Sequence, residues 1–280
     1  MVDLPIPDPA DGLLASEVGV WTEVEKHVRL RRYVDASRSA RARFVGPGNA
    51  GAAYVDLFCG YGRCVVREDG RFIDGSPLVA HREAQRGGVG FTALHIADLE
   101  QAKVDAATQR LNKLQANVHP WVGPATETVH QVLGAISPAG LHIVLLDPFG
   151  LEQLPFTVIE TLARGLQRVD LLMHVSLMDL QRNFRRYLES SDCGLDAFCP
   201  GWRDKVSDRM TEREARRRVL QLWVGKIRDL GLKVYENQIE AVRGGRNQPL
   251  YCLVFASHNP LAHKLWNAIR QVGRQRQLEL

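Results

Sequence analysis

The fold is decided by one stretch of the sequence, Tyr54-Val55-Asp56-Leu57-Phe58-Cys59-Gly60-Tyr61-Gly62-Arg63. A short apolar run opens this stretch, and a loop with two glycines follows. Continuous apolar runs are typical of parallel strands that are covered on both faces. Glycines after a strand let the backbone turn sharply and approach a ligand closely. The stretch predicts a strand followed by a ligand-binding loop, and an ordinary strand and turn is the alternative.

Apolar runs of the same kind recur along the chain and alternate with helical patterns. The runs cover residues 52–58, 91–96, 141–146 and 169–177, and the helical patterns between them cover residues 76–85, 99–115 and 156–166. This alternation predicts βαβ units and a mostly parallel sheet. The last three runs are followed by Asp98, Asp147 and Asp179. Because ligands bind at the carboxyl ends of the strands in open α/β sheets, aspartates there are candidate site residues.

The glycine loop has the form D-x-F-x-G-x-G and lacks the third glycine of the dinucleotide-binding fingerprint. It resembles motif I of class I S-adenosylmethionine-dependent methyltransferases, in which the loop wraps the methionine part of the cofactor. The resemblance implies S-adenosylmethionine as the cofactor of this chain. The residues that it assigns to cofactor binding in the loop are Asp56, Phe58, Gly60, Gly62 and Arg63.

The acid that ends the second strand extends the implied cofactor site. Asp98 lies at the strand end, where a carboxylate can accept hydrogen bonds from both ribose hydroxyls. Glu100 is expected to open the following helix, where a negative charge is favourable. Asp98 is therefore the predicted ribose ligand, and a plain helix N-cap is its alternative role.

The fourth strand ends in Asp147-Pro148-Phe149-Gly150, which resembles the D-P-P-Y motif of amino-group methyltransferases. In such a motif the carboxylate and a backbone carbonyl accept hydrogen bonds from an exocyclic amine, and the aromatic ring stacks on a planar base. Positioning of this kind supplies much of the catalysis. Asp147, Pro148 and Phe149 are the predicted catalytic residues. This chain has Phe149-Gly150 where the motif has Pro-Tyr, and a structural Asp-Pro turn is the alternative.

Several phrases of the chain together resemble the three-Cys-motif partner protein family. They cover residues 25–33, 56–63, 74–80, 146–150 and 251–262. The resemblance implies a bacterial α/β protein with a Rossmann-like class I methyltransferase fold. Such a fold has a mostly parallel seven-stranded sheet with a C-terminal antiparallel strand, here with an added helical and loop insertion. The family also implies a partner, a radical-SAM-like protein that carries three cysteines.

The predicted organisation is an N-terminal arm and covering helix in residues 1–45 and a methyltransferase-like domain in residues 46–280. Residues 1–12 are rich in proline and aspartate and are expected to form a flexible arm. The helix after this arm carries Lys26 and His27, which lie either beside the cofactor or on a solvated face.

The second half of the chain is expected to contain an insertion and a final hairpin. The insertion covers about residues 181–230 and has a polar loop at 190–207 between two arginine-rich helices. Residues 233–242 and 249–256 are predicted to form two strands of a hairpin. Residues 260–275 are predicted to form the last helix.

The composition is that of an ordinary globular protein. The 280 residues are 45% hydrophobic and 24% charged, with a formal net charge of +4, which excludes disordered, collagen-like and coiled-coil chains. Apolar runs fall short of the roughly 20 residues that span a membrane, and no signal-peptide pattern opens the chain, so we expect a cytoplasmic protein without membrane contact. The cysteines are five, an odd number, and have no C-x-x-C spacing, so we expect neither a disulfide framework nor a metal site.

Two hypotheses of function follow. The chain is a methyltransferase acting on an amine-bearing ring such as a nucleobase, or it is a catalytically weak or inactive accessory subunit of the radical-SAM-like partner. Tyr61, His174, Arg182 and Arg185 are candidate substrate contacts. The arginines of the insertion suit the phosphates of a nucleic acid, and a solvated, ion-paired face is the alternative. The sequence does not indicate the oligomeric state.

Overall fold

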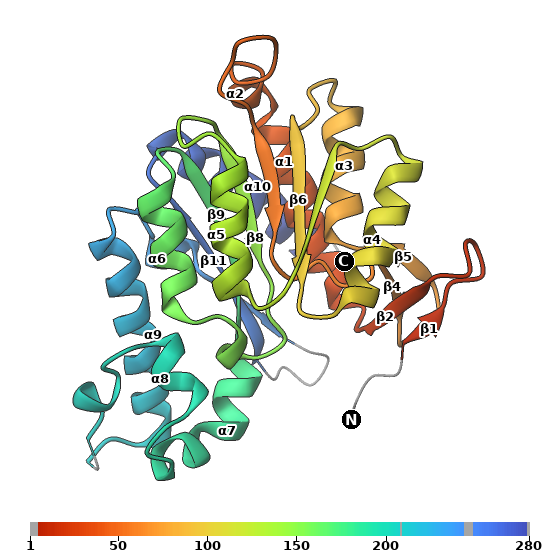
Figure 1. Ribbon diagram of the computed structural model, residues 1–280. Coiled ribbons are helices and arrows are strands. Elements are labelled where there is room, and N and C mark those ends of the chain that lie inside the picture. The colour runs from red at the N-terminus through yellow and green to blue at the C-terminus, as the bar shows by residue number, and fades with distance from the viewer. Residues whose placement is uncertain (1–4, 208, 244–248, 279–280) are drawn as a thin grey trace.

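A seven-stranded sheet forms the centre of the molecule (Figure 1). The computed structural model describes residues 5–207, 209–243 and 249–278, with side chains up to Arg270. The strand order across the sheet is β10-β11-β9-β8-β3-β6-β7. The strands are β3 (Ala53–Asp56), β6 (Ala93–Asp98), β7 (Val118–Val122), β8 (His142–Leu146), β9 (Val169–Ser176), β10 (Glu240–Arg243) and β11 (Pro249–Ser257).

The pairing directions give the sheet its class. Strands β7, β6, β3, β8 and β9 are parallel neighbours. Strand β11 is antiparallel to β9, and β10 is antiparallel to β11. The predicted Rossmann-like class I methyltransferase fold is confirmed, including the C-terminal antiparallel strand. The carboxyl ends of β6, β3, β8 and β9 therefore meet at one edge of the sheet, where Asp56, Asp98 and Asp147 lie at or next to strand ends.

Helices cover both faces of the sheet, because successive strand residues point to opposite faces. Val55 packs in one core cluster, with α5 (Ala125–Ala135), α6 (Phe156–Gly165) and α9 (Glu212–Asp229). Tyr54, the preceding residue, packs in the other cluster. The helices on that side are α1 (Val28–Ala36), α3 (Ser76–Arg86), α4 (Gln101–Lys113) and α10 (Pro260–Leu278). Both faces of each central strand are buried, which explains the unbroken apolar runs.

A second sheet of four strands was not predicted. It contains β1 (Ile6–Pro7), β2 (Leu14–Val18), β4 (Arg63–Val66) and β5 (Phe72–Asp74), in the order β1-β2-β4-β5. The prediction of a flexible arm is wrong for the described part of residues 1–12, because β1 pairs with β2 and Asp8 is 1% exposed. The carboxylate of Asp8 lies 2.9 Å from the guanidinium of Arg63 in β4, which ties this segment into the four-stranded sheet.

The helical insertion begins directly after β9 and lies on the opposite side of Figure 1 from the four-stranded sheet. It consists of α7 (Leu177–Glu189), α8 (Gly194–Phe198) and α9, and we call it the α7–α9 unit. The polar loop predicted at 190–207 is wrong in part, since α8 and a turn of 3₁₀-helix at Arg203–Lys205 lie within it. Trp202 is fully buried, and its indole N–H donates to Asp196 at 2.8 Å. That hydrogen bond lets the aromatic ring pack in the core.

The C-terminal hairpin is present, with a shorter first strand than predicted. Of residues 233–242, only those from Glu240 onward lie in β10, and Lys233 forms an isolated bridge with Ser257. The connection between the two predicted strands lies outside the described residues after Arg243. The covering helix is divided into a π-helical segment (Thr22–His27), α1 and α2 (Arg38–Arg41). In the part of the chain that the structure describes, no helix is long and apolar enough to cross a membrane.

Candidate active site at the carboxyl edge of the sheet

The glycine loop after β3 needs both of its glycines. Gly60 has φ +55° and Gly62 has φ +75°, values that disfavour side chains with a Cβ. A Cβ at Gly62 would lie 3.0 Å from Cα of Ala107 in α4. The loop therefore packs closely against α4. A Cβ at Gly60 would lie 3.5 Å from the hydroxyl oxygen of Ser16 in β2, which is an ordinary contact distance.

The strands β4 and β5 form a hairpin that interrupts the loop before α3. The N–H of Gly75 donates to the carbonyl oxygen of Gly62 at 2.8 Å. The residues before and after the hairpin are therefore close together. Ser76 opens α3, and its hydroxyl donates to Oδ2 of Asp56 at 2.6 Å. The start of α3 is thereby brought back to the end of β3, although 20 residues separate the two side chains.

Asp56 is fully buried beneath the loop. It accepts hydrogen bonds from the Tyr54 hydroxyl at 3.1 Å and from the Phe58 N–H at 3.1 Å, besides that from Ser76. Burial raises the pKa of Asp56 to about 7, against the opposite effect of these donors. Asp56 therefore shapes the loop from below, and Phe58 contributes its backbone N–H to the same network.

Asp98 lies beside the glycine loop, as a ribose ligand should. Its Oδ2 accepts from the N–H of Gly60 at 3.1 Å, and its Oδ1 accepts from the N–H of Glu100 at 3.3 Å. The helix α4 is capped at Glu100, so the alternative role of Asp98 as a helix N-cap is wrong. The side chain is 13% exposed, and a carboxylate has about four acceptor positions. Acceptor capacity therefore remains for a ligand hydroxyl.

Two residues of the predicted site serve other contacts. Arg63 pairs with Asp8 and with Asp74, both at 2.9 Å, and so links the four-stranded sheet internally. Tyr61 is 6% exposed, and its carbonyl oxygen accepts from the buried guanidinium of Arg110 at 2.7 Å. The Arg63 side chain is therefore not grouped with Asp98. Burial raises the pKa of Tyr61, and the charges of Glu100 and Asp98 add to this effect, so the Tyr61 side chain lies near Asp98.

Asp147 is the centre of a charged cluster at the end of β8. Its Oδ1 lies 2.6 Å from Nζ of Lys26 and 2.6 Å from Nδ1 of His174. Burial alone would raise the pKa of Asp147, but His174 and Lys26 together hold it well below its usual range. Burial lowers the pKa of His174, against the effect of Asp147. Asp147 is therefore an ionised carboxylate held by the His174 imidazole and the Lys26 amine.

Unpaired polar atoms surround this cluster. Nε2 of His174 and the hydroxyl of Tyr251 are buried and have no hydrogen-bond partner among the described residues. Oδ2 of Asp147, on a side chain that is 24% exposed, has no protein partner among the described residues either. Buried polar groups are paired in nearly all proteins, so exceptions call for a ligand or a water molecule. These three atoms are candidates for contacts with a polar substrate.

No pattern in the sequence indicates that Lys26 and Tyr251 contact the Asp147 cluster. The Lys26 side chain is 16% exposed, binds Asp147 and lies 4.8 Å from the ring centre of Tyr251, so the solvated-face alternative is wrong. Tyr251 lies in β11, next to β9, so the antiparallel strand brings it beside His174. The one sequence feature that could have indicated this contact is the position of Lys26 on a helix that precedes the sheet.

The loop after Asp147 presents an aromatic ring to the outside. Phe149 is 85% exposed, while Pro148 before it is buried. The first turn of α7 holds this loop, because Asp179 accepts from the N–H of Leu151 at 2.8 Å. The exposed ring of Phe149 therefore has a fixed support next to the carboxylate cluster.

The remaining predicted contacts lie on α7. Arg182 and Arg185 are exposed, and Arg185 pairs with Glu212 at the start of α9 at 2.6 Å. His174, Asp147 and Phe149 thus come together at the carboxyl edge, whereas these two arginines extend away along α7. In the described residues no group of three His, Cys, Asp or Glu side chains is arranged to hold a metal ion.

The residues at the edge fit S-adenosylmethionine on the chemistry of their groups. A loop with two positive-φ glycines offers its backbone, and a carboxylate with spare acceptor capacity lies beside it on the neighbouring strand. Gly60 and Asp98 are joined by a hydrogen bond, so the two parts of the predicted cofactor site are one structural unit.

Comparisons with known proteins show the fold. No family model and no curated protein matches the sequence. A solved Legionella pneumophila protein matches with a TM-score of 0.53 and 10% identity, over 91% of this chain and 92% of that chain. Cofactor-bound Rv0187 from MTB has a TM-score of 0.46 and 15% identity, over 82% and 79% of the two chains. The M. jannaschii TYW2 protein in complex with AdoMet has a TM-score of 0.41 and 11% identity, over 92% and 86%.

Proposed function

We propose that the protein is an S-adenosylmethionine-dependent methyltransferase that acts on a nitrogen of an amine-bearing ring, such as a nucleobase. The observation that carries the proposal is the hydrogen bond from Gly60, in the loop after β3, to Asp98 at the end of β6. Strand β3 also neighbours β8, at whose end the Asp147 cluster lies. A cofactor half on β3 and β6 and an acceptor half on β8 and β9 then meet at one edge of the sheet.

The cofactor half binds through the loop and the ribose ligand. Gly60 and Gly62 let the backbone of the loop come close to the bound ligand, and the Asp98 carboxylate accepts hydrogen bonds from the ribose hydroxyls. Asp56 supports the loop from inside the protein through Ser76 and Phe58. S-adenosylmethionine supplies an electrophilic methyl group when it is bound.

The acceptor half positions the nucleophile. Oδ2 of Asp147 accepts a hydrogen bond from the ring amine, while Lys26 and His174 keep this carboxylate ionised through Oδ1. The exposed ring of Phe149 stacks on the acceptor ring. A fixed orientation of the amine accounts for catalysis without a strong base.

Isothermal titration with S-adenosylhomocysteine tests the cofactor half, and a methyl-transfer assay on mixed nucleic acid and nucleosides tests the acceptor half. We expect binding at micromolar ligand, and transfer that Asp147→Ala abolishes while the binding persists. Absence of S-adenosylhomocysteine binding at millimolar ligand would contradict the proposal.

The engaged state of Asp147 favours one second candidate. Because Lys26 already donates to Oδ1, the carboxylate is partly satisfied within the protein. This suits an accessory subunit with weak or no activity, which keeps the fold to bind a radical-SAM-like three-Cys-motif protein, as the family resemblance implies. Co-purification with that protein, together with a lack of transfer by the isolated chain, supports this candidate. Robust transfer by the isolated chain rules it out.

A further inference from the structure

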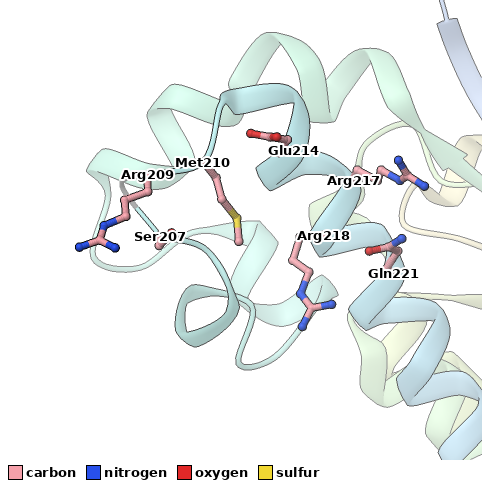
Figure 2. Close-up of a pocket in the computed structure, with 7 residues that line it drawn as sticks. All are labelled: Ser207, Arg209, Met210, Glu214, Arg217, Arg218 and Gln221. Carbon is pink, nitrogen blue, oxygen red and sulfur yellow. The ribbon is translucent and has the colours of Figure 1, made fainter.

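The α7–α9 unit carries most of the net positive charge of the chain. Residues 177–229 contain twelve Lys and Arg and nine Asp and Glu, which leaves three of the four net positive charges in this unit. A surface hollow of about 520 Å³ lies on it, and the arginines that line the hollow are Arg209, Arg217 and Arg218 (Figure 2). All three are exposed.

No acidic side chain among the described residues pairs with these arginines. The side chains of Arg209, Arg217 and Arg218 form neither an ion pair nor a hydrogen bond in this part of the chain. The acidic residue of the hollow, Glu214, caps α9 instead, accepting from the N–H and the hydroxyl of Thr211 at 2.8 Å. The alternative of an ion-paired face holds for Arg185 and Arg216, which share Glu212, but not for the hollow.

The arrangement of the guanidinium groups indicates the kind of anion. In Figure 2 the side chains of Arg209, Arg217 and Arg218 point in different directions around the hollow. They do not converge on one point, as a site for a single small anion requires. Separate phosphates along a polynucleotide match these divergent directions better, because each guanidinium can contact a different phosphate.

A second hollow, whose lining is partly apolar and also includes Arg203 and Glu212, lies next to the cationic one. It has a volume of about 310 Å³, lies between α7 and α9, and is lined in part by Phe184, Leu188 and Met210. Met210 lines both hollows. A partly apolar space beside free guanidinium groups offers a place for a base next to a place for its phosphates.

The α7 helix connects this surface to the candidate active site. Its first turn holds the Asp147 loop through Asp179, and Arg185, two turns later, pairs with Glu212 at the start of α9. Its 13 residues span about 20 Å at 1.5 Å per residue. That length corresponds to a few nucleotides of an extended strand. Arg182, also free of ion pairs in the described structure, lies on this helix.

We propose that the α7–α9 unit binds the sugar-phosphate backbone of a single-stranded polynucleotide and delivers one of its bases to Asp147 and Phe149. A single strand is required, because an exposed ring can stack only on a base that has left its duplex. The delivery step rests on the proposed methyltransferase function, whereas the backbone contact does not.

Fluorescence anisotropy with a labelled 12-nucleotide single strand, in one RNA arm and one DNA arm, tests the proposal. The variant Arg209→Gln/Arg217→Gln/Arg218→Gln should weaken binding at least about tenfold. It should also reduce the slope of log K against log salt by about two, since each single-strand phosphate contact contributes about 0.7. The control Arg38→Gln/Arg86→Gln/Arg164→Gln removes the same charge from arginines that pair with local acids, and should change binding less than about twofold.

The proposal is overturned if the wild type does not bind the strand in 50 mM salt, a low-salt condition that favours phosphate contacts. It is also overturned if the two triple variants lose equal affinity for the strand. A third contrary outcome is that poly-glutamate displaces the labelled strand as readily as unlabelled strand does. The last outcome would point to an acidic protein. Circular dichroism and S-adenosylhomocysteine titration of each variant verify its fold. If the wild type does not bind S-adenosylhomocysteine, the proposed methyltransferase function is refuted. The measured polynucleotide binding is not affected by that outcome.

Discussion

The ammonium group of Lys26 and the carboxylate of Asp147 meet at 2.6 Å, although 121 residues separate them in the chain. The contact joins the helix that precedes the sheet to the end of β8. Because His174 approaches the same oxygen, one carboxylate atom unites three elements. The covering helix is therefore part of the candidate acceptor site.

Removing the Lys26 charge should be detectable at His174. Lys26 lowers the pKa of His174, so Lys26→Met should raise it. The protein should also lose about 1–3 kcal/mol of stability, since a partly buried carboxylate loses one partner. NMR titration of the His174 ring measures the first effect. Lys113→Met, which removes an exposed lysine of α4, is the control and should leave the His174 titration unchanged. An unaltered His174 pKa in Lys26→Met would show that the cluster is not formed in solution.

Asp98→Ala should weaken S-adenosylhomocysteine binding by at least about tenfold, which is about 1.4 kcal/mol. The substitution removes the ribose acceptor and also frees the N–H of Gly60 that holds the loop. Isothermal titration measures the change. Glu100→Ala provides the comparison, because that side chain is 58% exposed and pairs only with Lys103 among the described residues. Similar affinities for the two variants would contradict the role given to Asp98.

Gly62→Ala should destabilise the protein by about 2–4 kcal/mol, from a strained positive φ and from the 3.0 Å approach to Ala107. Gly225→Ala is the matched opposite case. Gly225 lies within α9 with open space where its Cβ would stand, so alanine should stabilise the protein by about 0.5–1 kcal/mol. Urea unfolding of both variants gives the values. A neutral Gly62→Ala would mean that the loop does not pack on α4 as described.

His27 should make the protein acid-sensitive. Burial, with the nearby charge of Lys26, lowers the pKa of His27 to about 3. The unfolded chain binds a proton at this side chain below its ordinary pKa of about 6.5, and the folded chain does not until about pH 3. Stability therefore falls as the pH falls through this window, by about 3 kcal/mol at pH 4.

The matched pair for this effect is His27→Gln and His130→Gln. The first should flatten the decline in unfolding free energy between pH 6.5 and pH 4, whatever it costs at neutral pH. The second changes an exposed ring of α5 and should leave the decline as it is. Parallel pH profiles for wild type and His27→Gln would disprove the assignment.

The central strands were predictable because their residues are buried on both faces and are therefore apolar without interruption. Strand β7 was missed for the opposite reason. It lies at the edge of the sheet, is half exposed and contains Pro120, which an edge strand tolerates. Its sequence carries neither the apolar run nor an alternation. The backbone pairing with β6 alone makes it a strand.

The site was predictable in its parts and not in its connections. Asp98 and Asp147 follow from strand ends and glycine spacing, which are local signals. The approach of Lys26, Tyr251 and His174 to Asp147 depends on how distant elements pack, and no local pattern records it. Arg63 shows the same limit, because Asp8 and Asp74 reach it through a sheet that has short, weakly marked strands.

The tie between the first described residues and the glycine loop bears on how the protein is prepared in the laboratory. Asp8 holds Arg63, and Asp11 holds the Arg110 guanidinium that in turn binds the carbonyl of Tyr61 inside the loop. A proline-rich start invites trimming as dispensable. Trimming to Gly12 would leave Arg110 without Asp11 and Arg63 with Asp74 as its remaining carboxylate. A shortened protein that fails to bind cofactor would therefore report a damaged loop rather than an absent activity.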